Sequence, residues 1–207
     1  MKRAPIAVTM GDACGVGPEI LLRAFTAGAT PEDVVAVGDL EVLAHCARTL
    51  GLDVSLRPIR HPAECWPGAL NVVSLNLLRL EDLRVGEVCA PAGRAALGYV
   101  EHATHLALDG AVRAIVTLPV NKEAVRLTHP DFTGHTGFIA RRCGSPRHAM
   151  MLASPALLAT HVSTHVALAE AVRRVTRDRV YEVIRLTDEA AARLGRCRRI
   201  AVLGLNP

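Results

Sequence analysis

The chain has 207 residues, of which 50% are hydrophobic and 21% are charged, and its net charge is +4. This balance is typical of a globular protein, and the basic residues form no long block with interleaved aromatic side chains, so we expect no nucleic-acid partner. No apolar stretch reaches the roughly 20 residues that span a membrane, and the N-terminus does not resemble a signal peptide, so we expect a cytoplasmic protein without a membrane partner.

Apolar runs predict a series of buried strands in the first part of the chain. We expect these strands at residues 6–10, 34–37, 70–75 and 114–118. Amphipathic spacings predict helices between and after them, at residues 18–25, 40–50, 93–109 and 121–127. Pro18 and Glu19 favour a helix start, because proline suits the first helical position and a carboxylate suits the positive end of the helix dipole.

The second part of the chain is predicted to add helices at residues 138–143, 167–175 and 179–194. Two short apolar runs, 149–153 and 157–162, predict an antiparallel pair of strands, and residues 200–205 predict a last buried strand. Strands that alternate with helices predict an α/β fold, and the unalternating apolar strands fit a sheet covered on both faces. We expect a weakly marked domain boundary near residues 92–114.

The first group of candidate functional residues is the turn from Gly11 to Glu19, which follows the first strand. Glycines in such a turn let the backbone approach a ligand closely, and the N-terminus of the next helix favours an anion. The spacing matches neither a dinucleotide fingerprint nor a phosphate-binding loop, so the cofactor-binding residues stay unknown. A purely structural turn is the alternative interpretation.

Two further groups are polar. The loop Phe132–Gly137 contains His135 and Thr136 and could bind an oxyanion or a substrate hydroxyl, although Thr136 could also simply cap a helix. Lys122 follows an apolar strand and could bind phosphate or carboxylate or act in proton transfer, or be a solvated lysine at a helix start.

The last group is the run His161-Val162-Ser163-Thr164-His165. In an extended segment, alternation would place His161, Ser163 and His165 on one side. Imidazoles bind transition metals when further ligands are near, but a pair of hydrogen-bonded structural histidines is the alternative.

Taken in order, several short segments make the chain similar to the 4-hydroxythreonine-4-phosphate dehydrogenase family. They are Val8–Asp12 (VTMGD) with Gly15–Glu19 (GVGPE), Pro119–Lys122 (PVNK), Phe132–Thr136 (FTGHT), Met150–Ala153 (MMLA), Ser163–His165 (STH) and Gly204–Pro207 (GLNP). Their order and spacing match the family from end to end of the chain, so residues 1–207 resemble the N-terminal portion of a two-domain dehydrogenase.

The resemblance implies a two-domain α/β/α fold related to isocitrate and isopropylmalate dehydrogenases, and a homodimer whose active sites take residues from both subunits. It implies oxidation and decarboxylation of a 4-phosphorylated β-hydroxy acid, with NAD or NADP and a divalent metal (Zn, Mg or Co). By the family pattern, His135 and Thr136 contact the substrate and His165 is a metal ligand, while Lys122 is the candidate catalytic residue.

Asn121 and the run ending at His165 make the chain resemble relatives that act on D-threonate or D-erythronate 4-phosphate, and 4-phosphohydroxy-L-threonine is the other candidate substrate.

The chain departs from the family pattern at three places. Ala13-Cys14 replaces the usual Pro-Ala, which places a thiol near the site. The six cysteines show no CxxC spacing, and we interpret them as isolated thiols in a reducing compartment. Gly137 stands where the family often has Glu. The family also continues past Asn206-Pro207 with further metal ligands, so a non-catalytic fragment that folds and dimerises is the alternative to an active enzyme.

Overall fold

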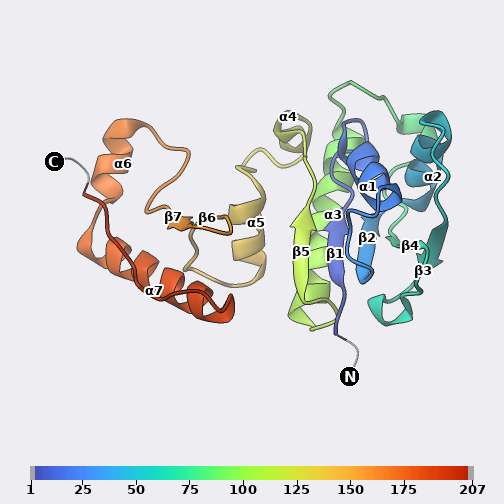
Figure 1. The fold of residues 1–207 in the computed structure, drawn as a ribbon. Helices are drawn as coiled ribbons and strands as arrows, with labels where there is room; N and C mark the ends of the chain where they lie inside the picture. Colours follow the sequence, from blue (N-terminus) through green and yellow to red (C-terminus); the bar gives the residue numbers. More distant parts are fainter. Residues whose placement is uncertain (1–2, 205–207) are drawn as a thin grey trace. The chain divides into compact units, whose positions relative to one another are not determined.

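The computed structural model describes residues 3–204 and divides the chain into two compact units, Met1–Cys143 and Gly144–Pro207 (Figure 1). The division lies after the boundary predicted near residues 92–114. Helix α3 (Ala90–Leu108) occupies most of that region and packs against three strands of the first unit, so this segment joins the unit instead of separating two domains.

The first unit is built on a parallel sheet of five strands, in the order β3-β4-β2-β1-β5. The strands are β1 (Ile6–Thr9), β2 (Val34–Gly38), β3 (Leu56–Ile59), β4 (Leu70–Ser74) and β5 (Ala114–Thr117). Strands β1, β2 and β4 are almost fully buried and mostly apolar, as expected for a parallel sheet with covered faces. The predicted α/β class is therefore confirmed.

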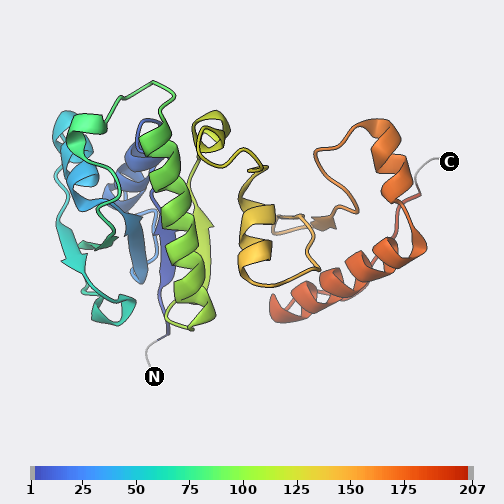
Figure 2. The same ribbon diagram turned by 180° about the vertical axis from the view of Figure 1, so that it is seen from behind.

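Helices cover both faces of this sheet. Figure 1 shows α1 (Gly17–Thr26) and α2 (Leu40–Thr49) on one side, and Figure 2, seen from behind, shows α3 on the other. Two short helices, α4 (Lys122–Arg126) and α5 (His135–Arg142), pack against α3. Single 3-10 turns occur at Pro62–Glu64 and Leu80–Asp82. Pro18 lies in the first turn of α1, as predicted.

A buried carboxylate fixes the loop that follows β4. Asp39, 1% exposed, accepts hydrogen bonds from the backbone N–H groups of Leu77 and Leu78 and from the Tyr99 hydroxyl, the last at 2.7 Å. Burial raises the pKa of Tyr99, so its phenol stays protonated and donates. This network ties the end of β2 and the loop after β4 to the middle of α3.

The second unit contains β6 (Met151–Ala153), β7 (Leu158–Thr160), α6 (Leu168–Arg174) and α7 (Arg177–Arg193). Strands β6 and β7 are antiparallel, which confirms the predicted pair. Only Val183 and Ala191 are buried apolar residues among the described residues of this unit, and Leu168 and Leu203 are 79% and 89% exposed. The unit therefore has a small core of its own.

The sequence prediction was wrong for two strands. Strand β3 was not among the strands predicted from the sequence; it pairs with β4, at an edge of the sheet where its Pro58 is tolerated. Conversely, residues 200–204 form no strand, and Leu205 lies outside the described residues. The segment has no hydrogen-bonded neighbour strand between residues 3 and 204, and an unpaired strand leaves its backbone groups unsatisfied. Within that same range, no helix is long and apolar enough to cross a membrane.

Candidate functional site

The carboxyl ends of β1 and β5 lie side by side at the point where the order of the strands in the sheet reverses. From β1, the chain continues to β2 on one side, whereas β5 lies on the other side of β1 after a crossover by α3. In open parallel sheets, ligands bind beyond the carboxyl ends of the strands at such a switch point. The residues that follow β1 and β5 are therefore the first place to look for a site.

The turn after β1 lies directly against the loop after β5. Gly11 has a φ of +74°, and a methyl group on it would lie 2.4 Å from the Pro119 carbonyl oxygen. The Asp12 N–H donates to that same oxygen at 2.9 Å. Only glycine combines this backbone conformation with so close an approach, so the sequence brings the first candidate group and the Pro119–Lys122 loop together.

Asp12 is a buried carboxylate at this edge, 6% exposed. One of its oxygens, Oδ1, accepts the Cys14 N–H at 3.0 Å. Burial raises the pKa of the Asp12 carboxyl, and the hydrogen bond from Cys14 opposes that shift only in part. Asp12 was not predicted from the sequence as a site residue in its own right. An acidic residue directly after an apolar strand and a glycine is the signal that could have identified it.

Thr9 is a second buried polar residue that sequence reasoning missed. It is the last residue of β1, pairs in register with Thr117 of β5, and is completely buried. Its hydroxyl oxygen has no hydrogen-bond partner among the residues that the structure describes. A single threonine in an apolar strand carries no signal in the sequence, because its burial depends on the neighbouring strands.

Lys122 is the first residue of α4 and is exposed. The helix starts here because the Asn121 side chain accepts hydrogen bonds from the backbone N–H groups of Glu123 and Ala124, at 3.0 and 3.1 Å. The Asn121 oxygen is therefore used in capping the helix. The lysine that follows projects from the cap toward the loop that precedes α5, where its side chain lies near Gly134.

Lys122 and His135 lie close together. Gly134 directly precedes His135, and a methyl group built on Gly134 would lie 3.9 Å from Lys122 Nζ, an ordinary contact distance. His135 follows as the first residue of α5, so this helix starts earlier than the predicted residue 138. The structure thus brings together two of the predicted site residues, which are 13 positions apart in the chain.

His135 is half-buried, with its ring against the edge of Phe132 at a centroid distance of 6.4 Å. Its Nε2 is buried and has no hydrogen-bond partner within residues 3–204. Burial lowers the pKa of His135, and the positive charge of Lys122 lowers it further. The imidazole is therefore neutral at pH 7 and can donate or accept one hydrogen bond at this nitrogen. Thr136, the next residue, is exposed.

His165 belongs to the second unit and is exposed. The alternation predicted that His161, Ser163 and His165 lie on one side of an extended segment. That prediction was wrong, because His165 has a φ of +56° and the chain bends at residues 165–166. Strand β7 ends at Thr160, and the loop after it is held by the Arg179 guanidinium, which donates to the Val162 carbonyl. No group of three metal-binding side chains occurs in the described part of the chain.

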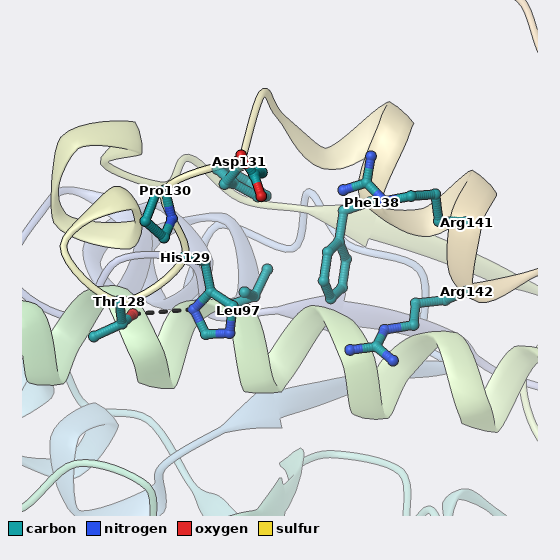
Figure 3. Close-up of a pocket in the computed structure, with 9 residues that line it drawn as sticks. Leu97, Thr128, His129, Pro130, Asp131, Phe138, Arg141 and Arg142 are labelled. Carbon is teal, nitrogen blue, oxygen red and sulfur yellow. Dashed lines mark hydrogen bonds between the residues drawn. The ribbon is translucent and has the colours of Figure 1, made fainter.

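A surface cavity of about 470 Å³ lies beside α3 and α5 (Figure 3). Leu97, Phe132 and Phe138 give it an apolar lining, and His129, Asp131, Arg141 and Arg142 add polar groups. Figure 3 shows Arg142 beneath Phe138, where its guanidinium stacks 5.1 Å from the ring centroid. Lys122, His135, Thr136 and His165 do not line this cavity, but Phe132, which packs against the His135 ring, does.

Comparison with known proteins gives a consistent result. Residues 30–207 match the family model described as pyridoxal phosphate biosynthetic protein PdxA. The chain is 39% identical to the D-threonate 4-phosphate dehydrogenase of Salmonella typhimurium, over all of this chain and 65% of that protein. It is 38% identical to the 4-hydroxythreonine-4-phosphate dehydrogenase of Beijerinckia indica, over 98% of this chain and 61% of that protein.

A solved structure is similar in fold as well. The crystal structure of 4-hydroxythreonine-4-phosphate dehydrogenase from Klebsiella pneumoniae superimposes with a TM-score of 0.91 at 39% identity, covering 99% of this chain and 64% of that one. The chain thus spans a little under two thirds of the length of the relatives that it matches.

Proposed function

Because this chain belongs to the PdxA family, we propose that the protein is a dehydrogenase that oxidises a 4-phosphorylated hydroxy acid with NAD or NADP. The observation that carries the proposal is the pair formed by Lys122 and His135 at the carboxyl edge of a parallel sheet. A cation and a neutral imidazole with a free buried nitrogen can together bind an anionic group and a neighbouring hydroxyl.

Lysine is rare in this chain, which supports a specific role for Lys122. Of the 24 lysine and arginine residues, only Lys2 and Lys122 are lysines. Arginine therefore serves almost everywhere that a positive charge alone is needed. A compact ammonium group differs from a guanidinium in that it fits a confined site and can exchange a proton. Both properties suit binding of a phosphate or carboxylate, or proton transfer, next to His135.

The roles of the site residues follow from these properties. Lys122 binds an oxyanion of the substrate, and His135 Nε2 hydrogen-bonds to the hydroxyl that is oxidised. The exposed Thr136 hydroxyl contacts the substrate beside it. NAD or NADP accepts the hydride when bound. The buried carboxylate of Asp12 at the same strand edge is a further candidate for a proton acceptor, because its raised pKa brings it closer to neutral pH.

A divalent metal does not fit the described residues alone. His165 is the one residue assigned to a metal by resemblance, but Zn sites use three or four protein ligands and no such cluster occurs between residues 3 and 204. If His165 binds Zn, Mg or Co, the remaining ligands must come from outside these residues. We therefore assign no step of the reaction, including the decarboxylation, to a metal.

For the substrate, D-threonate 4-phosphate and D-erythronate 4-phosphate are proposed ahead of 4-phosphohydroxy-L-threonine. Overall identity does not separate the candidate substrates, because the two relatives named above differ from each other by only one per cent in their identity to this chain. The support is therefore the sequence pattern at Asn121 and His161–His165. Asn121 caps α4, so we do not assign it a contact with the substrate. A non-catalytic protein is not favoured, because each named relative is called a dehydrogenase. The homodimer and the cytoplasmic location remain predictions.

The test is an assay of nicotinamide reduction, followed by absorbance at about 340 nm. The protein, together with a version extended to the length of its relatives, is incubated with each of the three 4-phosphates, NAD or NADP, and Zn, Mg or Co. Lys122→Met should raise KM about tenfold or more, because a charge-assisted hydrogen bond contributes roughly 1.5–3 kcal/mol. Arg198→Met, at an exposed residue paired with Asp188, is the matched control.

Activity with one of the three substrates, weakened by Lys122→Met and His135→Ala but not by Arg198→Met, would support the proposal. Absence of NAD(P)H formation by the extended protein with all three substrates would contradict it. If the protein is active but Lys122→Met leaves KM unchanged, the proposed dehydrogenase activity stands and the proposed role of Lys122 is refuted.

A further inference from the structure

Two cysteines from distant parts of the chain are in direct contact in the first unit. Cys14 lies in the turn between β1 and α1, Cys89 directly precedes α3, and their sulfur atoms are 3.5 Å apart. Both are free thiols. Within residues 3–204, no other two cysteine sulfurs are hydrogen-bonded. The contact therefore singles out one pair among the six cysteines.

Hydrogen bonds on several sides hold Cys14 in this position. Its N–H donates to Asp12 Oδ1 at 3.0 Å, and its carbonyl accepts the Gly86 N–H at 2.7 Å. Its sulfur accepts the Arg84 N–H at 3.4 Å. The backbone N–H groups of Arg84 and Gly86 thus hold the segment before Cys89 against Cys14. The backbone on both sides therefore keeps the two sulfur atoms close together.

We propose that Cys14 and Cys89 form a redox site that closes into a disulfide when the protein meets hydrogen peroxide. The sulfurs need to approach by about 1.5 Å to reach bonding distance. One peroxide molecule oxidises the two thiols, and the products are one disulfide and two molecules of water. A dithiol reductant reverses the reaction by thiol–disulfide exchange.

Exposure sets the order of the steps. Cys14 is 2% exposed, whereas Cys89 is half-buried and within reach of solvent. The Cys89 sulfur attacks one peroxide oxygen, the O–O bond breaks, and a sulfenic acid and the first water form. The Cys14 sulfur then attacks the Cys89 sulfur, the S–O bond breaks, and the leaving oxygen takes up a proton to become the second water. Cys14 is thus the resolving cysteine.

The second step should be slow at neutral pH. Burial raises the pKa of Cys14 to about 11, and the neighbouring Cys89 sulfur and Asp12 carboxylate raise it too, while the Arg84 N–H lowers it. Only the thiolate attacks efficiently, so closure should accelerate about tenfold per pH unit between pH 7 and pH 9. The disulfide would fasten the turn that touches Pro119 to the start of α3, which links the redox state to the edge of the candidate site.

The experiment is peptide mapping of the native protein. The protein is treated with hydrogen peroxide, remaining thiols are blocked with iodoacetamide, and tryptic peptides are identified by mass spectrometry. Cys14 and Cys89 are each the single cysteine of their tryptic peptides, 4–23 and 85–94. We expect these two peptides joined, with the loss of two hydrogens, and separated again by dithiothreitol. The joined species should be absent from Cys14→Ala and Cys89→Ser and present in Cys143→Ser, a control at an exposed cysteine.

Recovery of peptides 4–23 and 85–94 as separate alkylated or sulfinic species from the oxidised wild-type protein would overturn the proposal. So would equal joining of either peptide to one that contains Cys46 or Cys143. The wild-type result alone decides the matter, so a variant that fails to fold does not affect the conclusion. A closure rate that is flat between pH 7 and pH 9 would refute attack by the Cys14 thiolate as the slow step.

Discussion

Replacing Gly93 by alanine should loosen the contact between α3 and α4. A methyl group on Gly93 would lie 2.3 Å from the carbonyl carbon and oxygen of Ala124 and 2.6 Å from the Val125 nitrogen. These are backbone atoms of α4, so no side-chain rotation can make room. Ordinary contacts begin at 3.4 Å, and α4 must therefore shift by about 1 Å.

Two effects compete, and their relative sizes determine whether Gly93→Ala raises or lowers the free energy of unfolding. Alanine is a better helix former than glycine by about 1 kcal/mol in a helix interior. Overpacking a buried contact costs about 1–3 kcal/mol, and a clash with backbone belongs at the upper end. We therefore expect Gly93→Ala to lower the free energy of unfolding by roughly 1–2 kcal/mol.

Gly98→Ala, in the same helix, is the matched control. There the added methyl group would lie 2.5 Å from Leu77 Cδ1, the end of a flexible side chain that is 48% exposed and can rotate away. The helix preference should then prevail, and the variant should be stabilised by about 0.5–1 kcal/mol. The two variants should differ by roughly 1.5–3 kcal/mol, although both replace glycine by alanine in α3.

The measurement is urea unfolding followed by tryptophan fluorescence. Trp66 is the only tryptophan and lies in the first unit, so its signal reports this unit alone. Because α4 begins at Lys122, Gly93→Ala should also weaken substrate binding, and Gly98→Ala should not. If Gly93→Ala unfolds at the same or a higher urea concentration than Gly98→Ala, with an equal m value, the packing argument is refuted.

Further predictions concern three buried or half-buried groups. Tyr99→Phe removes a hydrogen bond to the buried Asp39 carboxylate and should cost about 1.5–3 kcal/mol in urea unfolding; no loss would mean that the bond is not formed. Lys122→Met should raise the pKa of His135 measured by NMR, yet leave it below 6.5, because burial is the larger cause; Lys122→Arg should leave it low. The folded-state pKa of Asp12 is raised above 3.8, so ionisation opposes folding and stability falls as pH rises through its titration. Asp12→Asn should therefore be more stable than wild type at pH 7 in urea unfolding, and the gain should vanish in acid, whereas an equal gain at all pH values would contradict the burial argument.

Much of the first unit could be predicted from local pattern. The strands at β1, β2, β4 and β5 are short, mostly apolar runs, and Pro18 marks a helix start, so each signal lies in a few neighbouring residues. Edge strand β3 was missed because Pro58 argues against a strand, and pairing with β4 outweighs that preference. The start of α5 at His135 depends on the unusual conformation of Gly134, which no pattern of apolar residues indicates.

The candidate site was predictable in its members but not in its arrangement. The sequence placed Lys122 and His135 in separate segments, and only the packing of α4 and α5 on α3 brings them together. The burial of Asp12 likewise depends on the contact between Gly11 and Pro119, which joins residues more than 100 positions apart. The bend at His165 broke the strand alternation, because a positive φ ends an extended segment.

The network around Asp39 has a consequence for how a nicotinamide cofactor could be recognised. In doubly wound nucleotide-binding folds, an acidic residue at the end of the second strand hydrogen-bonds to the ribose of the dinucleotide. Asp39 occupies that place after β2, but it is 1% exposed and already accepts from two backbone N–H groups and the Tyr99 hydroxyl. Here that carboxylate is used in internal hydrogen bonds that hold the sheet edge, so under the proposed function other residues would have to distinguish NAD from NADP.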